Sequence, residues 1–321
     1  MTKEDLEGAS VLVTGGAGFI GSHLVDALIE FGARVRVLDN LSTGLASNLD
    51  HCRGGIDFVE GDLRAPADCK KACNGVGLVF HQAALGSVPR SMKDPATSIH
   101  VNVVGTTNIF AAARDAGVHR VVYASSSSVY GDSAKLPKKE GEEGQPLSPY
   151  ALSKSMNEQL ASVFASNYGM SFVGLRYFNV YGPRQRPDGA YAAVIPRFFH
   201  AGLAGETPMI HGDGAQSRDF TFVADAVKAN ILAAIVDAEG SFAVNVAGGN
   251  RTTVSELARL VLDKAGSSIL PEHGPPRAGD VRHSLADLSR VEDLLGYQPS
   301  TDLAEGLTAS LQHYRSTFAT T

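Results

Sequence analysis

The sequence has few of the features that mark secreted, membrane-embedded or nucleic-acid-binding proteins. Only three of its 321 residues are cysteine, too few for a disulfide framework, so reduced thiols are expected. No apolar run approaches the ~18 residues that span a bilayer, and the charged start MTKEDLEGAS is unlike a signal peptide. A net charge of −6 disfavours binding to phosphate backbones. We expect a cytoplasmic protein without membrane or nucleic acid partners.

The cysteines also give little support to a metal site. Cys69 and Cys73 are spaced as on one helix, and Cys52 stands next to His51. This spacing matches no common zinc-ligand pattern, so we expect no bound metal.

Strand and helix patterns alternate through the first half of the chain. Apolar β-branched runs predict strands, and apolar residues at helical spacing predict the helices between them. Helices are expected after Phe19, near Pro66, from Asp94 to Gly117 and from Ser148 to Gly169. The predicted strands are SVLVTGG, RVRVLDN, IDFVEGDL, GLVFHQAA, HRVVYASSSSVYG and SFVGLRYFNVYG. The alternation predicts an α/β fold, a Rossmann-type doubly wound parallel sheet with helices on both faces.

The second part of the chain has a different composition. After about Gly182, glycine, proline and arginine become denser, as in GPRQRPDGAYAAVIP and GPPRAGDVRH. We interpret residues 1–182 as a dinucleotide-binding domain and residues 183–321 mainly as a smaller substrate-binding lobe. Some segments of this lobe are expected to return to the first domain.

A glycine-rich turn joins the first predicted strand to the first helix. Gly15, Gly18 and Gly21 allow a tight turn and close backbone approach, and the helix N-terminus attracts a pyrophosphate. Asp39 ends the next strand, where a carboxylate can bind the ribose hydroxyls and repel a 2′-phosphate. NAD is therefore favoured over NADP, although Arg34 and Arg36 stand nearby.

Further cofactor candidates follow the ends of the predicted strands, because sites of such sheets lie beyond the carboxyl ends. Asp62 is either a ligand of the adenine amino group or an ordinary capping residue. His81 in HQAA is more consistent with a structural role. The other candidates are Phe19, Ile20, Asn40, Ser42, Thr43, Gly44, Leu63, Gln82, Ala83, Ala84 and Tyr177.

Tyr150 and Lys154 form the candidate catalytic couple. They are four residues apart on one predicted helix, so they share a face. A phenol with a pKa near 10 is a poor base at neutral pH, but a neighbouring ammonium favours the phenolate. Beside a dinucleotide, Tyr150 would act as general acid and base. Ser126, at the end of the fifth strand, would hydrogen-bond the same substrate oxygen.

These motifs together resemble the extended short-chain dehydrogenase/reductase family. The segments LGSVPRS, SPYALSK, LRYFNVYGPRQ, GAYAAVIPRF, DGAQSRDF and GDVRHSLAD are similar to those of nucleotide-sugar 4-epimerases acting on UDP-N-acetylhexosamines. The resemblance covers nearly the whole chain. It implies an NAD-dependent isomerase that epimerises C4 of UDP-GlcNAc or UDP-GalNAc through a transient 4-keto sugar, with UDP-glucose and UDP-galactose as further candidates.

The resemblance also assigns a role to each site residue. Ser126 and Tyr150 would handle the proton, and Lys154 would contact the nicotinamide ribose. Ser284 would line the wall beside the sugar C2 substituent, where a small side chain leaves room for an N-acetyl group. The diphosphate is assigned to Asn179, Arg218 and Arg277, the uridine ribose to Asp280, and the uracil to Ala193 and Val194; Gly86, Ser87, Ser127 and Arg197 complete the expected substrate site.

Other reactions of the family fit less well. Sugar dehydratases and decarboxylases carry a carboxylic acid just before VYG, where this chain has Ser127 and Ser128. A UDP-glucuronate 4-epimerase is the remaining alternative enzyme. A non-enzymatic NAD-sensing protein would predict a damaged catalytic set, whereas Tyr150, Lys154 and Ser126 are all present. The family also implies a homodimer, through the helices that begin at Asp94 and Ser148.

Overall fold

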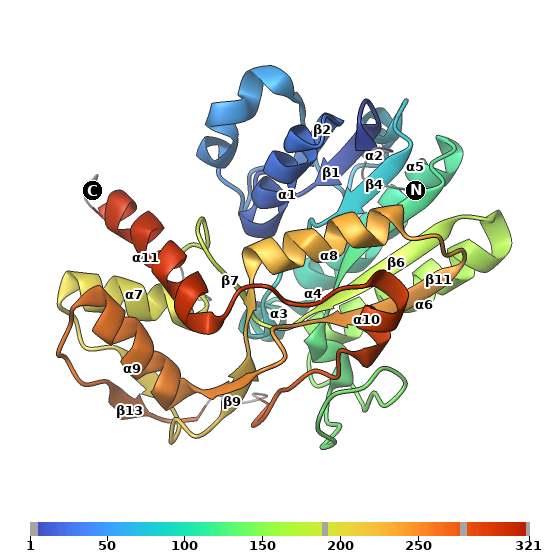
Figure 1. Ribbon diagram of the computed structural model, residues 1–321. Helices are drawn as coiled ribbons and strands as arrows, with labels where there is room; N and C mark the ends of the chain where they lie inside the picture. Colours follow the sequence, from blue (N-terminus) through green and yellow to red (C-terminus); the bar gives the residue numbers. More distant parts are fainter. Residues whose placement is uncertain (1–5, 188–191, 277–280, 319–321) are drawn as a thin grey trace.

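A seven-stranded parallel sheet forms the centre of the molecule (Figure 1). The computed structural model describes residues 6–187, 192–276 and 281–318. The strand order is β11-β6-β5-β4-β1-β2-β3, which confirms the predicted Rossmann-type doubly wound sheet. The strands are β1 Ser10–Thr14, β2 Arg34–Asp39, β3 Asp57–Glu60, β4 Leu78–His81, β5 Arg120–Ser126, β6 Ser171–Tyr177 and β11 Ser241–Val246.

Helices cover both faces of this sheet, and each face has its own hydrophobic cluster. The first face packs against α1 Phe19–Glu30, α8 Val223–Ile235 and α10 Ser289–Leu295. The second packs against α2 Pro66–Cys73, α5 Gly105–Asp115 and α6 Pro149–Tyr168.

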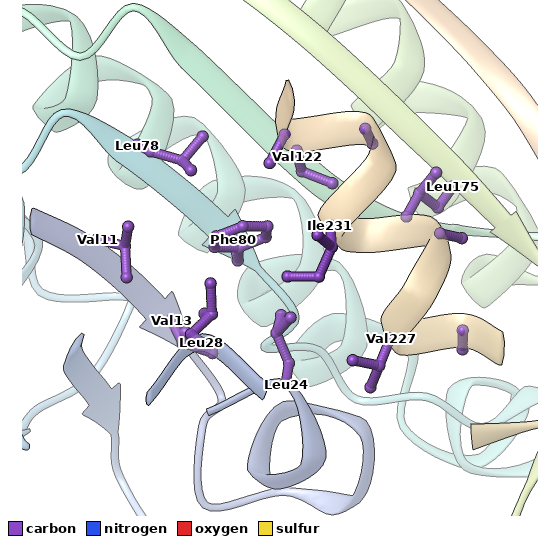
Figure 2. Packing of buried hydrophobic residues seen from close by; sticks show 14 of the residues in the cluster. Val11, Val13, Leu24, Leu28, Leu78, Phe80, Val122, Leu175, Val227 and Ile231 are labelled. Atoms are coloured by element: carbon purple, nitrogen blue, oxygen red, sulfur yellow. The ribbon is translucent and has the colours of Figure 1, made fainter. Parts of the chain in front are cut away.

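The alternation of side chains along each strand explains why the strand sequences are apolar throughout. In β1, Val11 and Val13 belong to the first cluster, while Leu12 between them belongs to the second. Figure 2 shows the first cluster, where strand residues such as Phe80 pack toward Leu24 of α1. A strand buried on both faces has few positions for a polar side chain before it ends. Polar site residues therefore gather where the strands stop.

Local signals in the sequence set the ends of α6. The Ser148 hydroxyl accepts a hydrogen bond from the Ala151 N–H at 3.1 Å, and Pro149 occupies the first turn. Gly169 follows the helix with a left-handed φ of 65°. These contacts confirm the helix start and stop predicted from the sequence.

The helix predicted from Asp94 to Gly117 is divided into three parts. Asp94 caps α4, Pro95–Ile99, by accepting the Thr97 N–H at 3.1 Å, as expected. A π-helical turn, His100–Val104, follows and leads into α5.

The remaining elements pack around a third hydrophobic cluster beside the sheet. Its helices are α7 Val194–Ala204, α9 Val254–Ala265 and α11 Leu303–Phe318. Two elements after residue 182 belong to the first part of the molecule: β11 is a strand of the central sheet, and α8 packs on its first face. The short strands are β7 Val180–Tyr181, β8 Met209–His211, β9 Ser217–Asp219, β10 Thr221–Phe222, β12 Arg251–Thr253 and β13 Glu272–Gly274. Within the described ranges, no helix combines the length and apolarity needed to cross a bilayer.

Candidate active site

The glycine-rich turn between β1 and α1 is packed too tightly for side chains. Gly15 has a φ of +70°, and a Cβ there would lie 2.7 Å from the Ala83 Cα. At Gly21 an added Cβ would lie 2.1 Å from the Gly15 carbonyl oxygen. The Gly18 N–H donates to that same oxygen at 3.0 Å, which closes the turn. The backbone at the start of α1 is thereby left open to a bound anion.

Asp39 at the end of β2 is buried beside this turn. Its carboxylate oxygens accept hydrogen bonds from the N–H groups of Ala17 at 3.0 Å and Leu41 at 2.8 Å. Burial raises the pKa of Asp39, and these backbone donors oppose the rise. Arg36 instead bonds to Asp57 and to the carbonyls of α2 and its C-terminal end. Neither Arg34 nor Arg36 lines the cavity that Asp39 faces.

A cavity of about 910 Å³ extends along the carboxyl edge of the sheet. It contains almost the whole set of residues predicted to bind the cofactor. The lining residues in that set are Gly15, Gly18, Phe19, Ile20, Gly21, Asp39, Asn40, Ser42, Thr43, Asp62, Leu63, Gln82, Ala83, Ala84, Tyr150, Lys154 and Tyr177. The glycine turn and the Asp39 carboxylate fit the pyrophosphate and ribose of a dinucleotide.

Gly44 and Ser87 are the residues expected in the site that, among those described, line no cavity. A Cβ on Gly44 would lie 2.9 Å from the Ala17 carbonyl carbon, so Gly44 allows a loop to pack on the glycine turn. The Ser87 hydroxyl accepts the Arg90 N–H at 3.2 Å and caps α3, Val88–Lys93. Both residues shape the wall without facing the cavity.

Asp62 and His81 have partners of their own. The Asp62 carboxylate accepts hydrogen bonds from Asn40 and Arg64, and these hold its pKa below the usual range. The buried His81 ring contacts the Thr14 hydroxyl at 2.7 Å and the Thr106 hydroxyl at 2.9 Å. Burial lowers the pKa of His81 to about 3, so the ring is neutral and structural.

The candidate catalytic residues line the same cavity where β5 ends and α6 begins. They are Ser126, Tyr150 and Lys154. The Ser126 hydroxyl lies beside the Tyr150 hydroxyl and favours its ionised form. The Lys154 ammonium donates to the Ala124 carbonyl at 2.7 Å and lies 5.9 Å from the Tyr150 ring centroid. The helical spacing of the couple and the strand end at Ser126 produce this arrangement.

Burial acts on both members of the couple. It lowers the pKa of Lys154 to about 8, with Glu158 opposing the change. Burial also raises the pKa of Tyr150, while the neighbouring Ser126 hydroxyl lowers it. The ammonium is therefore mostly charged at neutral pH, and Tyr150 is a phenol in the ligand-free protein.

A second cavity, of about 530 Å³, adjoins the first. Ala193, Val194 and Arg197 line it, and Asn179 and Arg218 line both cavities. Ser127, Gly86 and Ser284 line the first cavity. Arg277 and Asp280, the remaining predicted substrate ligands, lie outside the described residues.

Several cationic residues of the first cavity were missed by the sequence interpretation. Arg90 stands inside the quoted segment LGSVPRS, and Arg184 and Arg186 stand inside GPRQRPDGA, so the motifs contained the signal. Lys138 also lines the cavity but lies between the quoted motifs, in a segment that pairs with Ala286.

The cysteines are distributed over both faces of the sheet. Cys69 and Cys73 are buried in the second cluster, and burial raises the pKa of each thiol to about 12. Cys52 packs on the first cluster, where its sulfur and ligand atoms of Asp26 and His51 lie within 4.8 Å of one another. Asp26 is already paired with His51 and Arg184 at 2.7 and 2.8 Å.

A family model described as NAD dependent epimerase/dehydratase family matches residues 11–247. The chain belongs to this family. The predicted family resemblance and the enzyme class are thus confirmed. The epimerase/dehydratase match includes the glycine turn, Asp39 and the catalytic couple, and it ends just after β11.

Individual members of the epimerase/dehydratase family match over nearly the full chain. A UDP-glucose 4-epimerase of Mycolicibacterium smegmatis is 41% identical over 310 residues, covering 95% of this chain and 98% of its own. The structure of UDP-N-acetylglucosamine 4-epimerase from Methanobrevibacter ruminantium, in complex with UDP-N-acetylmuramic acid, has 41% identity and a TM-score of 0.92, covering 97% and 99% of the chains. A UDP-glucuronate 4-epimerase of Arabidopsis thaliana is 36% identical, covering 96% of this chain and 76% of its own. These similar proteins differ in the sugar that their names give.

Replacing Gly15 by alanine should empty the cofactor site. A left-handed φ costs a non-glycine residue roughly 1–2 kcal/mol, and the new Cβ would also press on the Ala83 backbone. Gly75→Ala is the matched control, because Gly75 has a φ of +74° and nothing within 4 Å of an added Cβ. Both variants should lose thermal stability, but only Gly15→Ala should purify without bound NAD, measured by absorbance of the denatured supernatant. Equal NAD content in the two variants would contradict the tight-turn interpretation.

Proposed function

We propose that the protein is an NAD-dependent UDP-sugar 4-epimerase that interconverts UDP-GlcNAc and UDP-GalNAc. The observation that carries the proposal is the convergence of Ser126, Tyr150 and Lys154 at one end of a cavity whose other end has the glycine turn and Asp39. Bound NAD would supply a hydride acceptor at the sugar C4 and a second positive charge beside the Tyr150 phenol.

Tyr150 would carry the proton. In its ionised form it accepts the proton of the sugar 4-hydroxyl as C4 loses its hydride, which leaves a 4-keto sugar. After the keto sugar turns over, the hydride returns to the other face of C4 and Tyr150 gives the proton back to the oxygen. Lys154 favours the phenolate by its charge, and the Ser126 hydroxyl orients the reacting oxygen. No external oxidant is consumed.

The acids around the cavity favour epimerisation over dehydration. Among the described lining residues, the only carboxylates are Asp39 and Asp62, which belong to the glycine-turn end. At the reaction end, Ser127 and Ser128 occupy the positions where dehydratases need an acid. Neither hydroxyl can replace a carboxylic acid in the removal of water from C5 and C6.

The nucleotide is assigned to the second cavity. Arg218 would hold the diphosphate where the two cavities meet, as a charge-assisted donor. Asn179 has a φ of +36°, and its side-chain amide donates to the Asp219 carbonyl at 2.8 Å, so it would shape this junction mainly through its backbone. Ala193 and Val194 at the start of α7 would face the uracil.

The alternative substrate is UDP-glucuronate. Arg90, Lys138, Arg184 and Arg186 line the first cavity and could accommodate a sugar carboxylate. Incubation with UDP-GlcNAc, UDP-glucose and UDP-glucuronate separately, with chromatography of the products, distinguishes the two enzymes. Conversion of UDP-glucuronate alone would replace the proposal by the alternative, and conversion of none would reject both.

Tyr150→Phe should abolish turnover while the protein keeps its NAD. The change removes the ionisable oxygen but almost no volume, and a positioned acid–base group typically contributes about 10²–10⁴-fold. The measurement is kcat with UDP-GlcNAc, together with NAD content and melting temperature as controls for folding. A kcat within threefold of the wild type would reject the role of Tyr150.

Ser284→Tyr should change the sugar preference. Ser284 is 8% exposed and lines the first cavity, so a phenol ring at this position would fill space that an N-acetyl group needs. Overpacking costs roughly 1–3 kcal/mol, which corresponds to about 5- to 150-fold in kcat/KM. The loss should affect UDP-GlcNAc and spare UDP-glucose, and Ser284→Ala should keep the wild-type preference. An unchanged ratio of kcat/KM for the two substrates in Ser284→Tyr would show that Ser284 does not contact the sugar.

We also propose a homodimer through the helices that follow Asp94 and Ser148. Leu152 and Val163 are 45% and 55% exposed and lie on the same side of α6, eleven residues apart. Val104, in the helical segment beside α6, is 41% exposed. Exposed apolar side chains that gather on neighbouring helices favour burial against a second copy.

A double variant, Leu152→Lys with Val163→Lys, should convert the dimer into a monomer in sedimentation velocity. Two ammonium groups in an apolar interface would lack partners. Leu270→Lys is the control, because Leu270 is 82% exposed but follows α9 in the second lobe. A wild type that sediments as a monomer, or a double variant that stays dimeric, would overturn this interface.

A further inference from the structure

A buried ion pair lies behind the catalytic residues and takes no part in lining either cavity. Arg176 of β6 has a side chain that is 7% exposed, and Glu158 of α6 has one that is 16% exposed. The guanidinium donates two hydrogen bonds to the carboxylate, from Nε to Oε1 at 2.9 Å and from Nη2 to Oε2 at 2.7 Å. Two-point pairs of this kind fix orientation as well as distance.

Glu158 belongs to the same helical stripe as the catalytic couple. It lies four residues after Lys154, which itself lies four residues after Tyr150, so all three share one face of α6. The last three residues of β5 each receive one contact from this stripe. Tyr150 lies beside the Ser126 hydroxyl, Lys154 donates to the Ala124 carbonyl, and Glu158 accepts the Ser125 hydroxyl at 2.5 Å.

Arg176 also connects the helix to the turn that follows Ser126. Its Nη1 donates to the Tyr130 hydroxyl at 3.1 Å and to the Glu143 carboxylate, and its guanidinium lies 5.1 Å from the Tyr130 ring centroid. The Tyr130 hydroxyl in turn donates to Asn245 of β11 at 2.7 Å. The Arg176 guanidinium therefore connects α6 with the turn Ser127–Tyr130 and with Glu143 in the segment before α6.

The Glu158 charge acts on the catalytic lysine. Burial lowers the pKa of Lys154 to about 8, and Glu158 is the group that opposes this. The other charged or titratable groups around the two side chains come from every neighbouring element. They are His81 from β4, Tyr123 from β5, Arg176 from β6 and Tyr150 on α6 itself, with Tyr130 and Glu143 bound to Arg176.

We propose that Glu158, held by Arg176, is a positioning residue that fixes the register of α6 on β5 and keeps the Lys154 ammonium charged beside Tyr150. The inference rests on the catalytic roles proposed above for Tyr150 and Lys154. It adds a residue that touches neither substrate nor cofactor, since neither Glu158 nor Arg176 lines a cavity.

The test is the pH profile of kcat for Glu158→Gln, which keeps the shape but removes the charge. Lys154 loses its proton as the pH rises through about 8. Without the carboxylate this loss occurs at lower pH, so the alkaline limb of kcat should move down by about 0.5–1 unit. At pH 8.5 kcat should fall roughly 3- to 8-fold, with KM unchanged, because no substrate contact is lost. If the alkaline limb of the Glu158→Gln profile superposes on that of the wild type, the proposal is overturned.

Asp225→Asn is the matched control for a structural role. Asp225 is a fully buried carboxylate on α8 that accepts the Ser300 N–H and hydroxyl at 2.9 and 2.7 Å. This variant should lose thermal stability but keep the wild-type pH profile. If Glu158→Gln behaves in the same way, Glu158 is only a structural residue.

Arg176→Lys is made in parallel and carries the test alone if Glu158→Gln does not fold. It keeps the positive charge but loses the bidentate hydrogen bonds to Glu158, so kcat should fall at least about threefold at unchanged KM. The alkaline limb of the pH profile should stay at the wild-type pH. A kcat equal to that of the wild type would overturn the positioning role. If Tyr150→Phe is active, the proposed function itself fails. If Tyr150→Phe is inactive while Glu158→Gln and Arg176→Lys match the wild type, only this inference fails.

Discussion

The hydrogen bond from the Lys154 ammonium to the Ala124 carbonyl is the contact on which the candidate site depends. A buried ammonium needs an acceptor, and the end of β5 provides one at 2.7 Å. This bond holds α6 against the carboxyl edge of the sheet and places Tyr150 beside Ser126. Burial lowers the pKa of Lys154 to about 8, close to the point where the charge would be lost. The Glu158 carboxylate one turn further opposes that loss.

The sheet determines where the other functional groups can lie. Its strands are mainly apolar on both faces, so most polar site residues occur near the strand ends, and parallel strands end at the same edge. The glycine turn after β1, Asp39 after β2 and Ser126 at the end of β5 therefore line one cavity. The second lobe adds an adjoining cavity, and Arg218 lines both. This division is the basis of the proposed placement of cofactor and sugar in the first cavity and of the nucleotide in the second.

Much of the fold could be predicted because its signals are local. Ser148, Pro149 and Gly169 mark the ends of α6 within the sequence, and the glycine turn identifies the first strand and helix. The π-helical turn at His100–Val104 has no such signal and interrupts what the sequence predicts as one helix. The pairing of β11 with β6 and of Glu158 with Arg176 depends on contacts between separate elements. Motifs predict residues that line the cavities, whereas these supporting contacts depend on the tertiary fold.

The central claim is that C4 loses a hydride and receives the same hydride back while NAD stays bound. The most direct measurement uses UDP-GlcNAc with deuterium at C4 and follows the label by NMR and mass spectrometry during epimerisation in ordinary water. The account predicts that the deuterium remains on C4 of the UDP-GalNAc product. Epimerisation with loss of the label to solvent would contradict it, because C4 would then exchange a proton with water.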